Sequence, residues 1–307
     1  MKIAVIGAGG FLGTAVLKEL SGSNMEVIGI SSQAERLCRE YAEVNNIMFS
    51  DSLRDIPENT DVLLNCAFPR STDGEGMALG LRYIQEVFTA ASERISHAVI
   101  NISSQGVYDS KRVCAADENT PLKLESAYAV GKFASELLAD SICADIVHTN
   151  IRMASLIGPG LEQRVINKMV RQAVESRKIH VREGRQLFGY MDVRDAATAI
   201  IAVCNCAGRG GRLDTVYNLG SERNYTLMEI AARVAAAVKD FLGAPIEIIC
   251  EESQDVLNSS LVCDRFYKKF NWRPSISMDE TIHYLIKKIP GGVILLRNIY
   301  HETRNAA

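Results

Sequence analysis

A doubly wound α/β fold is predicted for the first half of this 307-residue sequence by three observations. Short apolar runs alternate with longer stretches whose apolar residues recur at the period of a helix. The apolar runs are continuous, as in strands that are buried on both faces of a parallel sheet. A glycine-rich turn joins the first apolar run to the first helical stretch. A sheet of this kind lies between two layers of helices, and its crossovers are right-handed.

The same alternation places each element of the first half. Strands are expected at residues 3–6, 27–30, 47–49, 62–64, 98–102 and 146–151. Helices are expected between several of these strands, at residues 11–20, 34–43, 79–92 and 127–141.

The second half predicts a smaller, mixed α/β lobe, which begins after the loop Gly158-Pro159-Gly160. Helices are expected at residues 162–176, 192–206, 226–239 and 278–288, and strands at 179–181, 216–219 and 246–249. Asp192 or Asp195 is expected near the positive end of the second of these helices. The predicted division is a sheet domain at 1–157, to which residues 190–219 return, and the smaller lobe at 158–307.

Composition excludes several classes of protein. Hydrophobic residues make up 47% of the chain, which supports a large core, and the net charge of −3 is dispersed, unlike a nucleic-acid footprint. The eight cysteines and five histidines are scattered, so no metal site is expected, and a reducing compartment is favoured. The first apolar run is too short for a signal peptide, and no run reaches the roughly 20 apolar residues of a membrane span. A cytoplasmic location without membrane contact follows as the expectation.

The glycine turn predicts a dinucleotide cofactor. Gly7, Gly10 and Gly13 have the spacing G-x-x-G-x-x-G between a strand and a helix. Glycines here allow a tight turn and let the backbone N–H groups of the helix start, around Phe11 and Leu12, approach a pyrophosphate. This arrangement is typical of a Rossmann-type NAD(P)-binding domain.

The residues after the second strand bear on the choice between NAD and NADP. NAD sites usually place an acidic residue there to bind the ribose 2′-hydroxyl. This sequence has Ser31 and Ser32 instead, and Arg36 follows in the next helix. The two serines leave room for a 2′-phosphate that Arg36 can reach, so NADP is slightly favoured over NAD.

A tyrosine and a lysine with a serine upstream indicate proton chemistry. Tyr128 and Lys132 are four residues apart at the start of a predicted helix, and therefore share one face of it. A nearby ammonium group stabilises a phenolate and lowers the tyrosine pKa. Ser104, at the end of a predicted strand 24 residues before Tyr128, can bind the substrate oxygen. These residue types suit an oxidoreductase that moves a proton alongside a hydride.

These features resemble the extended short-chain dehydrogenase/reductase family, in its NAD(P)-dependent epimerase/dehydratase group, which acts mainly on nucleotide sugars. The resemblance covers almost the whole chain. Its matching segments are residues 6–13, 61–67, 103–108, 128–132, 152–158, 190–197, 217–220 and 270–274.

The resemblance implies roles for particular positions. It implies catalysis by Ser104, Tyr128 and Lys132, with the lysine also binding the nicotinamide ribose. It implies further cofactor contacts near the adenine, the pyrophosphate and ribose, and the nicotinamide amide: Asp51, Ser52, Cys66, Ala67, Phe68, Arg70 and Met153. It implies substrate contacts at Ser104, Gln105 and Ser155.

Departures from the family pattern limit the choice of reaction and substrate. Sugar dehydratases of the group carry Asp-Glu after the catalytic position, where this chain has Gln105 and Gly106, so dehydration is disfavoured. Two arginines that clamp the substrate diphosphate in epimerases are replaced by Phe188 and Glu252. Arg185 is the candidate to substitute for them.

Three functions stay open. The first is a reductase that acts on a keto group of a sugar-like substrate, with Tyr128 donating the proton. The second is a nucleotide-sugar C4 epimerase with tightly bound NAD. The third is a non-enzymatic NAD(P)-sensing protein, although such proteins tend to lose the tyrosine or lysine. The resemblance also implies a homodimer formed by the helices at 79–92 and 127–141.

Overall fold

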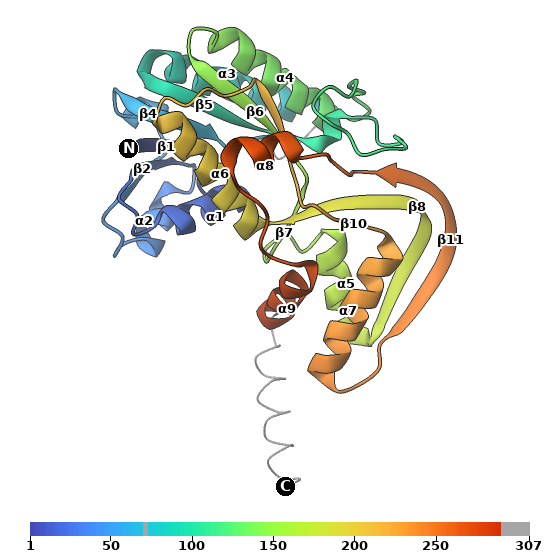
Figure 1. Ribbon diagram of the computed structural model, residues 1–307. Coiled ribbons are helices and arrows are strands. Elements are labelled where there is room, and N and C mark those ends of the chain that lie inside the picture. The colour runs from blue at the N-terminus through green and yellow to red at the C-terminus, as the bar shows by residue number, and fades with distance from the viewer. Residues whose placement is uncertain (70–72, 290–307) are drawn as a thin grey trace.

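The computed structural model describes residues 1–69 and 73–289 of the chain. In Figure 1 a large sheet with helices on both of its faces lies above a smaller lobe, in which helices pack against a long curved pair of strands. The predicted Rossmann-type, doubly wound fold with a smaller mixed lobe is confirmed.

The first part of the chain supplies most of the large sheet. Its elements are β1 (Lys2–Ile6), α1 (Phe11–Leu20), β2 (Glu26–Ile30), α2 (Ala34–Glu40), β3 (Ile47–Ser50), η1 (Leu53–Asp55), β4 (Thr60–Asn65), α3 (Gly74–Arg94), β5 (Ile95–Ser104), η2 (Gln105–Val107), α4 (Ala127–Ile142) and β6 (Val147–Met153).

The later part supplies the smaller lobe and returns once to the large sheet. Its elements are β7 (Ser155–Ile157), α5 (Val165–Ser176), β8 (Lys178–Asp192), α6 (Val193–Gly208), β9 (Val216–Leu219), β10 (Asn224–Tyr225), α7 (Leu227–Leu242), β11 (Glu247–Asn258), α8 (Asp264–Phe270) and α9 (Met278–Lys288).

The large sheet is parallel and has the strand order β3-β2-β1-β4-β5-β6-β9. Its central strands are buried on both faces, as their continuous apolar runs predicted, whereas the edge strand β3 exposes Met48. In β1, Ile3 and Val5 face one core cluster, while Ala4 and Ile6 face the other. The helix α6 packs against α1 on one face, and α3 and α4 pack against each other (Figure 1).

The smaller lobe is built on β8. This strand pairs in parallel with β11 and β7, and antiparallel with β10. The helices α5, α7 and α9 contact one another and enclose an apolar core that includes Ile179, Val181 and Tyr190 of β8.

Strands are present at the predicted positions 179–181 and 246–249, but they are much longer than predicted, because β8 and β11 extend to Asp192 and Asn258. At its start β8 alternates exposed and buried residues: Lys178 and Arg182 are exposed, whereas Ile179 and Val181 are buried. Charged residues on the solvent face interrupt the apolar run by which a strand is recognised in the sequence. The helix α8 was not predicted, and α5 begins three residues later than expected.

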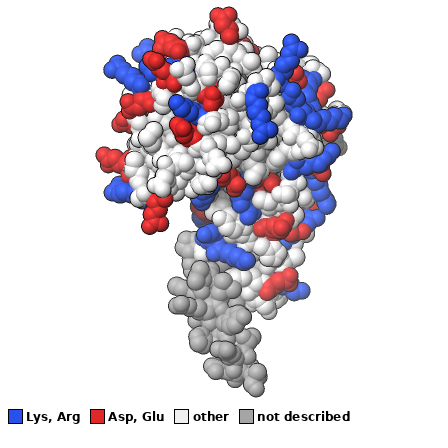
Figure 2. Space-filling view, turned by 60° about the vertical axis from the view of Figure 1, so that its left-hand side comes forward, with Lys and Arg blue, Asp and Glu red and all other residues white. Residues whose placement is uncertain are grey.

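The surface carries charges of both signs. On the face in Figure 2, lysine and arginine side chains lie among aspartate and glutamate side chains over most of the outline. Among the described residues, none of the helices combines the length and the apolar character needed to cross a bilayer.

Candidate active site

The glycine turn after β1 forms a cradle in which backbone atoms meet closely. Gly7 has a φ of 74°, and a Cβ atom there would lie 2.8 Å from the Ala67 backbone nitrogen. A Cβ on Gly13 would overlap the Gly7 carbonyl oxygen. Gly10 is the N-cap of α1, and no side chain caps the helix. The N-terminus of α1 is therefore open to an anion, which fits the pyrophosphate of a dinucleotide.

A cleft of about 540 Å³ opens beside this cradle. Its size lies within the range of small-molecule sites. It brings together many of the predicted cofactor residues with several that were not predicted: Gly7, Gly9, Gly10, Ile30, Ser31, Ser32, Gln33, Asp51, Cys66, Ala67, Phe68 and Tyr83. Leu12, Gly13 and Ser52 are not in this lining. Leu12 and Gly13 are buried, and the Ser52 hydroxyl accepts a hydrogen bond from the Arg54 backbone N–H.

Arg36, the predicted partner of a 2′-phosphate, already has carboxylate and amide partners. Its Nη1 lies 2.6 Å from Glu40 Oε1, and its Nε donates to Gln33 Oε1 at 2.9 Å. The Ser31 hydroxyl accepts the Gln33 backbone N–H at 3.1 Å. Gln33 thus connects the turn after β2 to Arg36, a link that the sequence alone does not indicate.

Ser104 and Tyr128 meet from two different elements. Ser104 is the last residue of β5, and its hydroxyl accepts the Gly106 backbone N–H at 3.1 Å. Tyr128 lies in the first turn of α4, which the Ser126 hydroxyl caps by accepting the Ala129 N–H. Tyr128 packs edge-on against the Phe68 ring and is 40% exposed. Neither residue lines the cleft, but Tyr128 adjoins it through Phe68, which does. A hydroxyl pair beside a cofactor cleft is the arrangement that proton transfer to a substrate oxygen requires.

The pKa of Tyr128 reflects competing effects. Burial raises the pKa, whereas a hydrogen bond with Ser104 and the positive charge of Arg164 lower it. Lys132 is not among the groups that shift this pKa. The lysine Nζ donates to the Ile102 carbonyl oxygen at 2.7 Å and lies 4.2 Å from the centre of the Phe68 ring. The expected lowering of the tyrosine pKa by this ammonium is therefore not seen in this arrangement.

Lys132 itself is buried and has a low pKa for a lysine. Burial lowers its pKa to about 8, while Cys66 and Glu136 raise it. Burial also raises the pKa of the Cys66 thiol, to about 12. Near neutral pH the lysine is thus charged and the thiol is not.

Arg164 is a cation in this region that was not among the predicted site residues. It directly precedes α5, is exposed, and lowers the pKa of both Tyr128 and Tyr190 by its charge. The loop leading to it passes the glycine turn, since a Cβ on Gly158 would lie 3.0 Å from Phe11 Cζ. Within the described residues, its guanidinium makes no hydrogen bond or ion pair. The sequence offered no signal for it, because Arg164 lies inside the helix predicted at residues 162–176 and precedes the helix only in the structure.

The remaining predicted residues take varied positions. Met153 is buried at the end of β6, and Ser155 begins β7 opposite Tyr190 of β8. Gln105 Oε1 accepts from Arg112 Nη2 at 3.4 Å. Arg70 lies outside the described residues, as does the side chain of Arg185.

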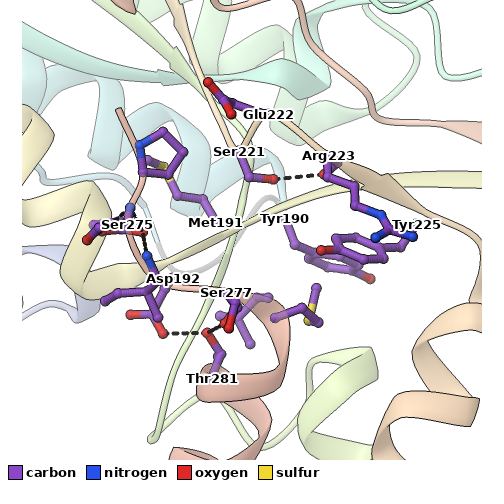
Figure 3. Close-up of a pocket in the computed structure, with 15 residues that line it drawn as sticks. Tyr190, Met191, Asp192, Ser221, Glu222, Arg223, Tyr225, Ser275, Ser277 and Thr281 are labelled. Atoms are coloured by element: carbon purple, nitrogen blue, oxygen red, sulfur yellow. Dashed lines mark hydrogen bonds between the residues drawn. The ribbon is translucent and has the colours of Figure 1, made fainter. Parts of the chain in front are cut away.

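A second cavity, of about 260 Å³, lies where the smaller lobe meets α6 (Figure 3). Asp192 caps α6, as expected from the sequence, and also accepts from Thr281 Oγ1 at 2.7 Å. Asp195 accepts from the Ser275 and Ile276 backbone N–H groups. Since both carboxylates are buried and hydrogen-bonded, they serve to join the lobes.

Comparison with known proteins identifies a family and relatives for this chain. A sequence model described as the NAD dependent epimerase/dehydratase family matches residues 3–220. The UDP-glucose 4-epimerase of Mycolicibacterium smegmatis is 24% identical over 92% of this chain and 96% of that protein.

Solved structures share the fold at low sequence identity. A UDP-glucuronic acid 4-epimerase from Bacillus cereus, in complex with a fluorinated sugar nucleotide and NAD, has a TM-score of 0.79 at 17% identity, covering 94% of this chain and 99% of that one. A dTDP-glucose 4,6-dehydratase from Bacillus anthracis, in complex with NAD, has a TM-score of 0.75 at 20% identity, covering 94% and 97%.

Proposed function

The chain belongs to the NAD dependent epimerase/dehydratase family, and on that premise we propose that it is an NAD-dependent nucleotide-sugar 4-epimerase. The observation that carries the proposal is the hydrogen-bonded Ser104–Tyr128 pair, which contacts Phe68 in the lining of the cleft at the glycine cradle. The reaction matches the second of the three functions that the sequence left open. The family is one of enzymes, which leaves the non-enzymatic sensor without support.

The proposed chemistry assigns one task to each residue. A bound nicotinamide supplies reversible hydride transfer. Tyr128 takes the proton from the sugar hydroxyl as that carbon is oxidised and returns it on reduction. Ser104 binds the same oxygen and holds the tyrosine hydroxyl by their hydrogen bond. Lys132, buried beneath Phe68, would hold the nicotinamide ribose, as the family resemblance implies.

We propose NAD as the cofactor in place of the slightly favoured NADP. The family description names NAD, and the Arg36 guanidinium is already paired with Glu40. A 2′-phosphate would have to compete with that carboxylate for the guanidinium, which weakens the case for NADP.

For the substrate we propose a sugar linked to a diphosphate. The relative from Mycolicibacterium smegmatis is named for UDP-glucose. The epimerase arginines are replaced by Phe188 and Glu252. The exposed guanidinium of Arg164 offers a positive charge that is near enough to Tyr128 to lower its pKa. Arg185 stays a prediction for the same role.

A ketoreductase is the second candidate, favoured by Ser31 and Ser32, which are neutral where NAD enzymes usually carry an acid. Dehydration stays disfavoured, because Gln105 and Gly106 offer no carboxylate next to Ser104.

We also propose a homodimer formed through α3 and α4, in the cytoplasm. Both helices expose large apolar side chains, among them Leu79, Val130 and Leu137. Free thiols, as a reducing compartment allows, are carried by Cys38, Cys66, Cys114, Cys143, Cys204, Cys206 and Cys263.

The function is tested with the purified protein and the variant Tyr128→Phe. We expect the wild type to interconvert UDP-glucose and UDP-galactose without added reductant, and to release NAD on denaturation. Without its hydroxyl, the variant should lose about 100-fold or more in kcat, while Tyr284→Phe, on α9, should keep wild-type turnover. Consumption of NADPH with a keto sugar, together with no interconversion, would identify the reductase instead.

A further inference from the structure

A buried polar network lies beneath the proposed catalytic residues. Its centre is Glu136, which lies one turn after Lys132 on α4 and is 2% exposed. Its carboxylate accepts from Arg152 Nη2 at 2.7 Å and Nε at 3.0 Å, and from the Ser103 hydroxyl. A carboxylate buried this deeply stays ionised only with such partners.

The network joins the elements that present the site residues. Ser103 immediately precedes Ser104 at the end of β5, and Arg152 immediately precedes Met153 at the end of β6. Arg152 Nη1 also donates to the Tyr108 hydroxyl at 3.1 Å. That hydroxyl in turn donates to Asn218 Oδ1 on β9 at 2.8 Å. One carboxylate thus fixes α4 relative to two neighbouring strand ends.

Lys132 is surrounded by groups that carry little charge. Cys66, from the loop after β4, is a neutral thiol, Phe68 presents its ring, and β5 offers the Ile102 carbonyl. Tyr128 precedes the lysine by one turn on the same helix, and its phenol is not among the groups that shift the Lys132 pKa. Cys66 and Glu136 are the two groups that raise the Lys132 pKa, and Glu136 is the carboxylate of the two, one turn further along α4.

We propose that Glu136 is a positioning residue that keeps Lys132 in its ammonium form and holds Ser104 and Met153 at the ends of their strands. The inference rests on the proposed function, because it assigns Glu136 a role in that same reaction. Glu136 is assigned no contact with substrate or cofactor, and acts through its neighbours Lys132, Ser103 and Arg152. The test of this role therefore measures the Lys132 titration as well as turnover.

The test is the substitution Glu136→Gln, which keeps the size of the side chain and removes its charge. Without the negative charge, the ammonium should lose its proton at lower pH, by about one pH unit. The basic limb of the kcat profile should shift by the same amount and in the same direction. The Lys132 titration is followed directly by NMR of protein labelled at the lysine Cε, with Lys132→Met assigning the resonance.

Two control variants separate charge from structure. Glu136→Asp keeps the charge and should titrate close to the wild type. Asp140→Asn removes a half-exposed carboxylate one turn further along α4, where it pairs with His148, and should leave the Lys132 titration unchanged.

If Glu136→Gln does not fold, the double variant Glu136→Gln, Arg152→Gln, which leaves no unpaired buried guanidinium, should show the same shift.

The outcomes distinguish this inference from the proposed function. An unchanged Lys132 titration in a folded Glu136→Gln variant would overturn the inference, even if the wild type is an active epimerase. A shifted titration in a protein without epimerase activity would support the role of Glu136 and contradict the proposed reaction instead.

Discussion

At the scale of single residues, burial and a few charges set the protonation states in the cleft. Burial raises the pKa of Tyr128 and lowers that of Lys132 to about 8. The lysine is mostly charged at pH 7 and loses its proton as the pH rises through 8. The rate of any step that requires the Lys132 ammonium should therefore fall above pH 8. Arg164 is exposed, so its guanidinium is accessible to an anion.

Arg164→Ala tests the proposed diphosphate contact. A charge-assisted hydrogen bond from a guanidinium to a phosphate contributes roughly 1.5–3 kcal/mol, so KM for UDP-glucose should rise about tenfold or more, with a smaller effect on kcat. Steady-state kinetics measure both. The matched control is Arg171→Ala, further along α5, where the guanidinium pairs with Glu162. A KM equal to the wild-type value would remove Arg164 from the substrate site.

At the scale of elements, α3 and α4 connect the site to the surface. Their contact is close, because a Cβ on Gly131 of α4 would lie 3.0 Å from Phe68 Cζ and would also overlap Met77 of α3. Phe68 in turn contacts both Tyr128 and Lys132. The outer faces of these helices carry exposed apolar residues. An interface on α4 would therefore involve the helix that carries Tyr128 and Lys132.

Leu137→Glu tests the proposed dimer. Leu137 is 53% exposed on α4, and a charge placed there would have to be buried on association. We expect the wild type to sediment as a dimer and the variant as a monomer at micromolar concentration. Val113→Glu changes an exposed apolar residue away from both helices and should leave the dimer intact. A monomeric wild type would refute the proposal outright.

At the scale of the whole molecule, the start of α6 connects the two parts. The strand β9 pairs with β6 and α6 packs on α1, so the chain returns to the large sheet after β8. We propose on this basis that residues 190–219 belong with the domain at 1–157, and that the rest of 158–307 forms the substrate lobe. Asp192 and Asp195 join the two by hydrogen bonds to the segment around α9.

Asp195→Asn tests this junction. The carboxylate is buried and accepts from Ser275 and Ile276, so an amide would turn an N–H group toward backbone donors. The free energy of unfolding should fall by roughly 1–3 kcal/mol, measured by urea denaturation. Asp240→Asn, an exposed change on α7, should have little effect. Equal stability of the two variants would show that the junction contributes little.

The sequence by itself determined the order along the chain of most strands and helices of the large sheet, and the glycine turn after the first strand. Continuous apolar runs, a glycine turn and helix periodicity are local patterns, so they can be read from neighbouring residues. The lengths of β8 and β11 were not predictable in this way, because their solvent faces are charged and the two strands are distant in the sequence.

Tertiary structure alone decided which charges act on the site. Arg164 is 36 residues from Tyr128 in the sequence, yet its charge lowers the tyrosine pKa. Glu136 is joined by Arg152 to the end of β6, and the Lys132 ammonium is directed at a backbone carbonyl instead of the tyrosine. Electrostatic effects depend on distance in space and on burial, and neither is determined until the strands and helices have packed.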